Sequence, residues 1–339
     1  MASATNLEPP QTQEFLHQAS DFRIGRLEIT NVGGNMINNN NPSQANSTET
    51  QGEQDDKMKD FFYLRTPKAP GIFVGRDELT KEGVNTLCGD KKVHLAILGD
   101  PGIGKTSLAL HIKQHPDIQD KFGKCCYFLP CDEAARQMQN QEAGDILLNG
   151  IVNILMNPAN GKSRHDLLKE HLKASDKDIL IILDNLETLW HSDEHSSVPN
   201  LINDMIKEKH VYLIVTMRER NIPKKIEGLW CQLGKREFGL PSLSLADAKE
   251  LFYHNAPKFK EEVHQVEDLE GLLNQAQGIP LAIQLLARQA DTHGSFEEFL
   301  GLWHHEGASM LNAAEENPSR FDCLQTSIEL SSSSIIIST

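Results

Sequence analysis

The stretch of sequence that decides the fold is Gly99-Asp100-Pro101-Gly102-Ile103-Gly104-Lys105-Thr106-Ser107. It fits the pattern G-x-x-x-x-G-K-[ST], in which glycines let successive backbone amides point at phosphate oxygens. The apolar run 93–98 before it is typical of a buried strand, and the run 106–115 after it is typical of a helix. The alternative, a chance glycine-rich turn, explains neither flank. The stretch therefore predicts a phosphate-binding loop.

The chemistry of this loop assigns a role to most of its residues. A helix N-terminus contributes partial positive charge, Lys105 can reach the β- and γ-phosphates, and Thr106 can bind Mg²⁺. The loop residues that we expect to contact a nucleotide are Gly99, Pro101, Gly102, Ile103, Gly104, Lys105, Thr106 and Ser107.

Composition narrows the partners that this chain is expected to have. Its 339 residues carry a net charge of −15, which argues against a general nucleic-acid or anionic-membrane surface. No apolar run is long enough to span a bilayer, and the N-terminus lacks a secretion signal. The six cysteines lack metal-ligand spacing, so reduced thiols in the cytoplasm are expected.

The chain divides by composition into four segments. Residues 1–57 are polar and predicted to be mostly disordered, with an alternating pattern over 22–34 that favours a short hairpin. Residues 58–240 read as an α/β nucleotide-binding domain, a parallel sheet with helices on both faces. The apolar runs that predict its strands are 93–98, 125–129, 179–183 and 211–215. Residues 241–312 predict a small all-helical domain, and the last segment, 313–339, ends in an irregular tail.

The partners of the loop indicate what is done with the phosphates. The run 179–183 is followed by Asp184, and a carboxylate at the end of such a strand orients Mg²⁺ or its water. The next residue, Asn185, cannot act as a base, so Glu187 is the nearest carboxylate that could polarise an attacking water. The alternative is that Glu187 only begins a helix.

A second strand end adds a basic residue. The run 211–215 is followed by Thr216, Met217 and Arg218. A polar residue and an arginine at this edge can contact the γ-phosphate, so Arg218 is predicted to sense its presence. The alternative is a surface loop with solvated charges. Lys105, Asp184, Glu187 and Arg218 are thus the candidate catalytic residues.

The order of these motifs resembles the NB-ARC class of STAND ATPases, which includes plant resistance proteins, apoptotic adaptors and fungal NOD-like receptors. The resemblance covers about residues 70–312, and it implies that residues 313–339 are the start of a truncated winged-helix domain. Besides the loop, its motifs are Phe73-Val74-Gly75-Arg76-Asp77, Leu183-Asp184-Asn185-Leu186-Glu187, Thr216-Met217-Arg218, Leu240-Pro241-Ser242-Leu243-Ser244 and Gly278-Ile279-Pro280-Leu281. It departs at Met217, where the family has a second threonine, and at Asn185, where it has a second acid.

The resemblance implies an ATP- or ADP-binding switch in innate-immune signalling. It places Val74 and Arg76 against the adenine, Pro280 against the base or ribose, and Mg²⁺ on Thr106 and Asp184. ATP hydrolysis would be slow at most. Implied partners are a second copy of the chain or a full-length receptor, without nucleic acid or membrane. A non-catalytic nucleotide-binding module and, less favoured, a small-molecule kinase are the alternatives.

Overall fold

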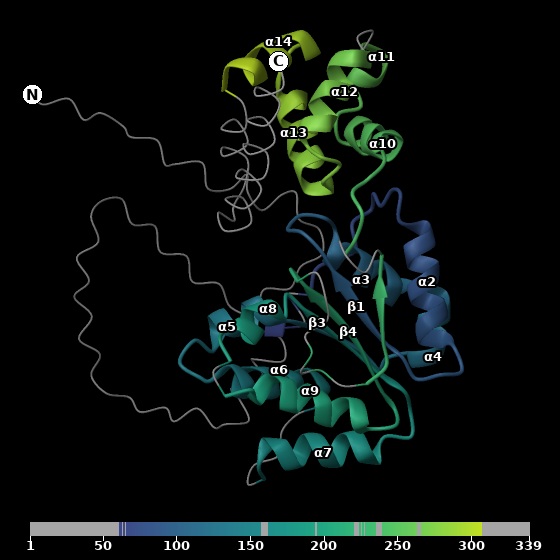
Figure 1. Cartoon of the computed structure of the whole chain (residues 1–339), viewed down its shortest axis with the longest axis vertical. Coiled ribbons are helices and arrows are strands. Elements are labelled where there is room, and N and C mark those ends of the chain that lie inside the picture. Colours follow the sequence, from purple (N-terminus) through teal and green to yellow (C-terminus); the bar gives the residue numbers. More distant parts are fainter. Residues whose placement is uncertain are drawn as a thin grey trace, which may run out of the picture. The chain divides into compact units, whose positions relative to one another are not determined.

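The structure is a computed structural model that describes residues 61, 62, 64, 66–156, 162–193, 195–219, 224, 226, 228–234, 239–262 and 266–306 (Figure 1). All of them belong to one compact unit, Glu49–Thr339. The expected hairpin at 22–34 and the expected winged-helix start at 313–339 lie outside the described residues.

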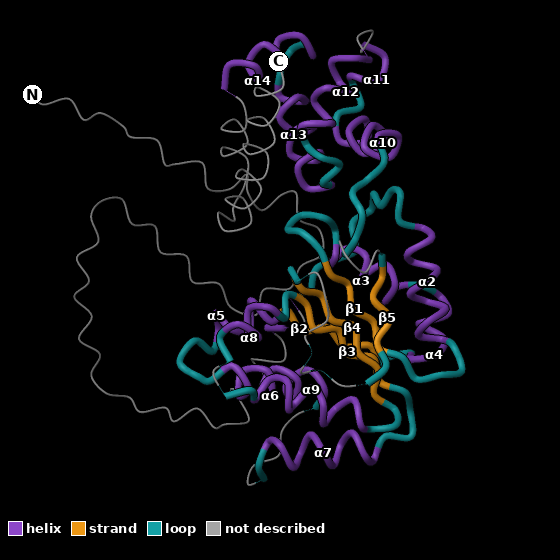
Figure 2. Tube along the Cα trace, viewed as in Figure 1, coloured by secondary structure: helices purple, strands orange, loops and turns teal. Residues whose placement is uncertain are grey.

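A parallel five-stranded sheet forms the centre of the α/β part (Figure 2). Its strands are β1 (His94–Leu98), β2 (Cys126–Pro130), β3 (Ile179–Asp184), β4 (Val211–Met217) and β5 (Trp230–Leu233). They lie in the order β2-β3-β4-β1-β5, and every neighbouring pair is parallel. The four strands predicted from apolar runs are confirmed. The edge strand β5 was not predicted.

The sheet is apolar on both faces, because alternate residues of each strand enter different cores. Leu95 and Ile97 of β1 belong to one buried cluster, whereas Ala96 and Leu98 belong to the other. Successive side chains of a strand point to opposite faces, so a continuous apolar run is what a sheet covered on both sides requires.

Helices cover both faces of this sheet, as predicted. The first cluster includes residues of α2 (Asp77–Cys88), α3 (Lys105–Gln114) and α4 (Pro116–Phe122). The second includes residues of α5 (Cys131–Gln137), α6 (Ala143–Leu155), α7 (Arg164–Ala174), α8 (Glu187–His191) and α9 (Ser197–Lys207). Figure 2 shows the strands between these two sets of helices.

The described chain after β5 is helical. Its helices are α10 (Leu245–Asn255), α11 (Phe259–Glu262), α12 (Val266–Gln275), α13 (Pro280–Thr292) and α14 (Phe296–Glu306). Ser244 caps α10 by accepting a hydrogen bond from the Asp247 amide, and Pro280 occupies the first turn of α13. Within the described part of the chain, none of the helices has both the length and the apolar character that crossing a bilayer requires.

Candidate functional site

Strand register brings three separate segments together at one edge of the sheet. Leu98 pairs with Met217, and Leu183 pairs with Val215. Gly99 and Arg218 directly follow the first pair, and Asp184 directly follows Leu183 of the second. These residues therefore meet at the carboxyl ends of the strands. Ligands of open parallel sheets bind at this edge.

The loop between β1 and α3 has the backbone that its glycines permit. Gly102 and Gly104 have φ values of 73° and 96°, which side chains disfavour. Helix α3 begins at Lys105, directly after Gly104. The first amides of a helix lack partners within it, so the start of α3 offers donors and partial positive charge to an anion.

Lys105 is buried, and its ammonium group lies over its own loop. The Nζ atom donates to the carbonyl oxygens of Gly99 and Asp100, both at 2.9 Å. Burial lowers the pKa of Lys105 from 10.5 to about 8, although the nearby Glu187 carboxylate opposes that shift. A phosphate would restore the favourable environment that the buried ammonium lacks.

The predicted magnesium residues are in direct contact. Thr106 donates its hydroxyl to Asp184, with distances of 2.8 Å to Oδ1 and 3.1 Å to Oδ2. Thr216 also donates to Oδ1 of Asp184, at 2.6 Å, and accepts from the Asn185 amide at 2.9 Å. Thr216 is fully buried, so it orients Asp184 and does not face a phosphate as the sequence suggested.

These residues fit a magnesium ion bound together with a nucleotide. A hydroxyl and one carboxylate lie side by side at the start of α3. No group of three or more His, Cys, Asp or Glu suited to a metal occurs among the described residues. Mg²⁺ is commonly held by one or two carboxylates, with waters and substrate phosphates completing the shell.

Glu187 and Arg218 form an ion pair. Arg218 Nε lies 3.1 Å from Glu187 Oε1. The second oxygen, Oε2, is buried without a hydrogen-bond partner among the described residues. Glu187 is also the first residue of α8. Its location therefore fits both interpretations made from the sequence, a carboxylate near the phosphates and the start of a helix. An unpartnered buried acceptor is costly unless something completes it.

The loop borders a cavity of about 160 Å³. Its lining includes Pro101, Gly102, Gly104, Lys105, Thr106, Ser107, Asn185 and Arg218, together with Pro280, Leu281 and Gln284 of α13. The Leu281 amide donates to the Gly102 carbonyl at 3.3 Å. A Cβ atom built on Gly104 would lie 4.0 Å from Pro280 Cγ. The start of α13 therefore lies against the phosphate-binding loop.

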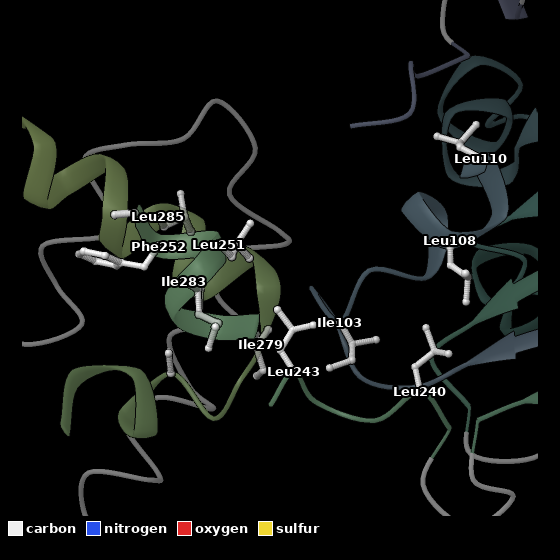
Figure 3. Packing of buried hydrophobic residues seen from close by; sticks show 14 of the residues in the cluster. Ile103, Leu108, Leu110, Leu240, Leu243, Leu251, Phe252, Ile279, Ile283 and Leu285 are labelled. Atoms are coloured by element: carbon white, nitrogen blue, oxygen red, sulfur yellow. The ribbon is translucent and has the colours of Figure 1, made fainter. Parts of the chain in front are cut away.

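A second, more apolar cavity of about 40 Å³ shares several lining residues with the first. Val74, Arg76, Ile103 and Pro280 are among the residues that line it. Figure 3 shows the side chains of Ile103, Leu243 and Ile279 close together at this place. The structure thus brings together the three residues, Val74, Arg76 and Pro280, that the family resemblance assigned to the base and ribose.

Gln284 and Leu243 are among the lining residues that the sequence analysis did not assign to the site. Gln284 lines both cavities, and it lies one helical turn after Pro280, so its spacing was an available signal. Leu243 lines the apolar cavity from the segment that joins the sheet to α10. Only the three-dimensional path of that segment reveals its position.

The fold and the loop define the class of this protein as a P-loop NTPase. Residues 94–258 match the family model described as the NACHT domain. This match supports the STAND class of P-loop NTPases and makes this part of the chain a nucleotide-binding module. The narrower NB-ARC type stays a prediction.

The solved structures that are similar to this chain are distant from it in sequence. The Walker-type ATPase PABY2304 of Pyrococcus abyssi is 11% identical with a TM-score of 0.49, covering 73% of this chain and 76% of that one. The ORC1 protein of Aeropyrum pernix, in complex with DNA, is 14% identical with a TM-score of 0.46, covering 70% and 66%. The ORC2 protein of the same organism is 17% identical with a TM-score of 0.42, covering 74% and 73%. No curated protein matches the sequence.

Proposed function

We propose that this protein is a nucleotide-dependent signalling switch of the NB-ARC type, acting in the cytoplasm as fungal NOD-like receptors do. It would bind ADP or ATP with Mg²⁺ and hydrolyse ATP slowly at most. The observation that carries the proposal is the lining of the phosphate cavity by both the loop and α13. A ligand that contacts two parts of a chain can bias their arrangement.

The ion pair at the site supplies a means of telling ATP from ADP. Arg218 is bound to Glu187 and also lines the cavity. A γ-phosphate would compete with Glu187 for the guanidinium, because phosphate oxygens accept bidentate arginine hydrogen bonds. ADP lacks that group and would leave the pair intact. The two nucleotides would therefore favour different states.

The same pair argues that turnover is slow. A base must lie within reach of the attacking water and be free to accept its proton. Asn185 cannot accept one. The Oε1 atom of Glu187 is bound to Arg218 and its Oε2 atom is buried, so Glu187 could accept the proton only while a γ-phosphate holds Arg218 away from it. This observation also favours a second candidate, a non-catalytic nucleotide-binding module that associates with a second copy of the chain or with a full-length receptor.

Mass spectrometry of the nucleotide that copurifies with the protein tests the proposal. We expect ADP in the wild-type protein and none in Lys105→Ala. Hydrogen exchange of α13 should then differ between protein loaded with ADP and protein loaded with a non-hydrolysable ATP analogue. Equal exchange in the two states would leave only the binding module. Absence of any adenine nucleotide, retained or rebound, would refute both candidates.

A further inference from the structure

A chain of hydrogen bonds joins the phosphate-binding loop to the segment between the sheet and α10, which we call the linker (residues 240–244). The Leu281 amide donates to Gly102, and the Leu243 amide donates to Gly278 at 2.9 Å. These two bonds connect the loop to the start of α13, and the start of α13 to the linker. A third connection, from the linker back to the loop, passes through a side chain.

That side chain is Arg76. Its Nη2 atom donates to the Pro241 carbonyl at 2.5 Å and lies 3.4 Å from the Ile103 carbonyl. Pro241 is in the linker, and Ile103 is in the loop. The three connections close a ring in which one guanidinium bridges two backbone segments that are far apart in sequence.

The surroundings of Arg76 favour a bridging position. Arg76 is only 4% exposed, and burial lowers its pKa while the Asp247 carboxylate opposes that shift. Asp247 lies in the first turn of α10, and its Oδ2 atom lies 2.5 Å from where a Cβ of Gly75 would be. The start of α10 therefore fits directly against the backbone that carries Arg76.

Arg76 is not needed to hold its own segment in place. The Phe73 ring stacks on His111 of α3, with centroids 3.8 Å apart and planes 10° apart. His111 Nε2 also lies 3.1 Å from the Pro70 carbonyl. These contacts anchor residues 70–73 to α3, which leaves the guanidinium of Arg76 to act on the loop and the linker.

We propose that Arg76 is a positioning residue that ties the linker to the phosphate-binding loop. Nucleotide binding at the loop then affects the linker and α13. The inference deepens the proposed switch and rests on it for its role, although the tie itself exists without nucleotide. A lysine at this position keeps the charge but lacks the planar fork that reaches two carbonyls.

Hydrogen exchange without nucleotide tests the tie itself. The variants are Arg76→Met and Arg76→Lys, and Lys81→Met on the exposed face of α2 is the matched control. In Arg76→Met, the peptides covering 241–245 and 278–284 should exchange roughly tenfold faster, the effect of losing a hydrogen bond from a charged group. Arg76→Lys should exchange at an intermediate rate with a melting temperature close to wild type, which decides the matter if Arg76→Met does not fold. Wild-type exchange in both variants would overturn the proposal.

Adding ADP separates this inference from the proposed function. In wild type and Lys81→Met, ADP should slow exchange in the loop, the linker and the start of α13. In Arg76→Met, at an ADP concentration raised until the variant is saturated, it should slow exchange in the loop alone. Protection of the linker and the start of α13 as strong as in wild type would overturn the positioning role. If ADP protects nothing in wild type, the switch fails, while the nucleotide-free comparison still decides whether Arg76 ties the linker.

Discussion

The two edges of the sheet both hold charged groups, which are half-buried at the amino ends of the strands and buried at the carboxyl ends, and they use them differently. At the amino ends of the strands, Lys92 donates to the carbonyls of Ile206 and Glu208 at 2.6 and 2.5 Å. At the carboxyl ends, Lys105 donates to carbonyls of its own loop. Lys92 therefore joins segments that are distant in the sequence, whereas Lys105 lines the cavity beside its own loop.

The acids show the same contrast. Asp178, just before β3, binds His210 Nδ1 at 2.8 Å and lies 3.7 Å from Lys121 Nζ. Glu187, just after β3, keeps one buried oxygen without a hydrogen-bond partner among the described residues. Complete pairing at the amino edge stabilises the fold. Incomplete pairing at the carboxyl edge leaves groups for a ligand to satisfy, which is typical of a functional site.

The largest expected difference between the edges comes from removing one lysine at each. Lys105→Ala should weaken ADP binding roughly 1,000-fold, because the buried ammonium would neutralise the β-phosphate. Lys92→Ala should leave the dissociation constant for ADP unchanged and lower the free energy of unfolding. Calorimetric titration and urea unfolding of both variants measure the two effects. Unchanged ADP affinity in Lys105→Ala would remove the functional half of the comparison.

Lowering the pH should destabilise the protein through a histidine at the amino edge of the sheet. His94 is the first residue of β1 and is buried, and its Nδ1 atom accepts a hydrogen bond from the Leu213 amide at 3.1 Å. Burial, with help from Lys92, lowers the pKa of His94 from 6.5 to about 4. The unfolded chain therefore binds a proton between pH 6.5 and 4 that the native chain does not, so stability falls as pH falls through that window, by about 3 kcal/mol.

Urea unfolding at several pH values measures this loss. His94→Asn keeps an acceptor for the Leu213 amide and removes the titration, so part of the acid sensitivity should disappear. The exposed His305→Asn is the control and should keep the wild-type pH dependence. An identical pH profile for His94→Asn and wild type would contradict the assignment to His94.

Thr216 tests whether one part of the carboxyl edge is structural. Thr216→Val removes a donor to Asp184 and an acceptor for the Asn185 amide, so it should lower the free energy of unfolding by about 2 kcal/mol. Thr216→Ser keeps the hydroxyl and should lose much less. Equal losses for the two variants in urea unfolding would mean that methyl packing, not hydrogen bonding, makes Thr216 matter.

The smallest expected effect concerns discrimination between nucleotides. Arg218→Ala should lower the affinity for ATP relative to that for ADP by about tenfold, the value of one charge-assisted hydrogen bond. Arg136→Ala, which removes an exposed arginine paired with Asp132 and Glu133, should leave the ratio unchanged. Competition titrations with a fluorescent ADP give both ratios, and a constant ratio in Arg218→Ala would rule out its sensing role.

Much of the sheet could be predicted, because a strand buried on both faces leaves a continuous apolar run. Strand β3 shows this in full, with every residue buried. Strand β5 does not, since three of its four residues are only partly buried and Gln232 interrupts the pattern. Helix α2 was also missed, because only Gly83, Val84 and Leu87 of its residues are buried.

The site was predictable where one segment makes it and unpredictable where distant segments meet. The loop at Gly99 follows from its own residues. The bond between Arg76 and Pro241 spans 165 residues, and nothing local to either residue announces it. The pairing of Glu187 with Arg218 likewise depends on how the chain after β3 turns toward the end of β4.

Because the start of α13 lies against the loop, the motion of α13 affects how long a nucleotide stays bound. A nucleotide held in the cavity that Gly104 and Pro280 both line would leave no faster than α13 moves aside. Its residence time would then depend on how often the helical segment opens, as well as on the strength of the phosphate contacts. In such a protein, the opening rate of α13 would help to set how long each nucleotide-bound state lasts.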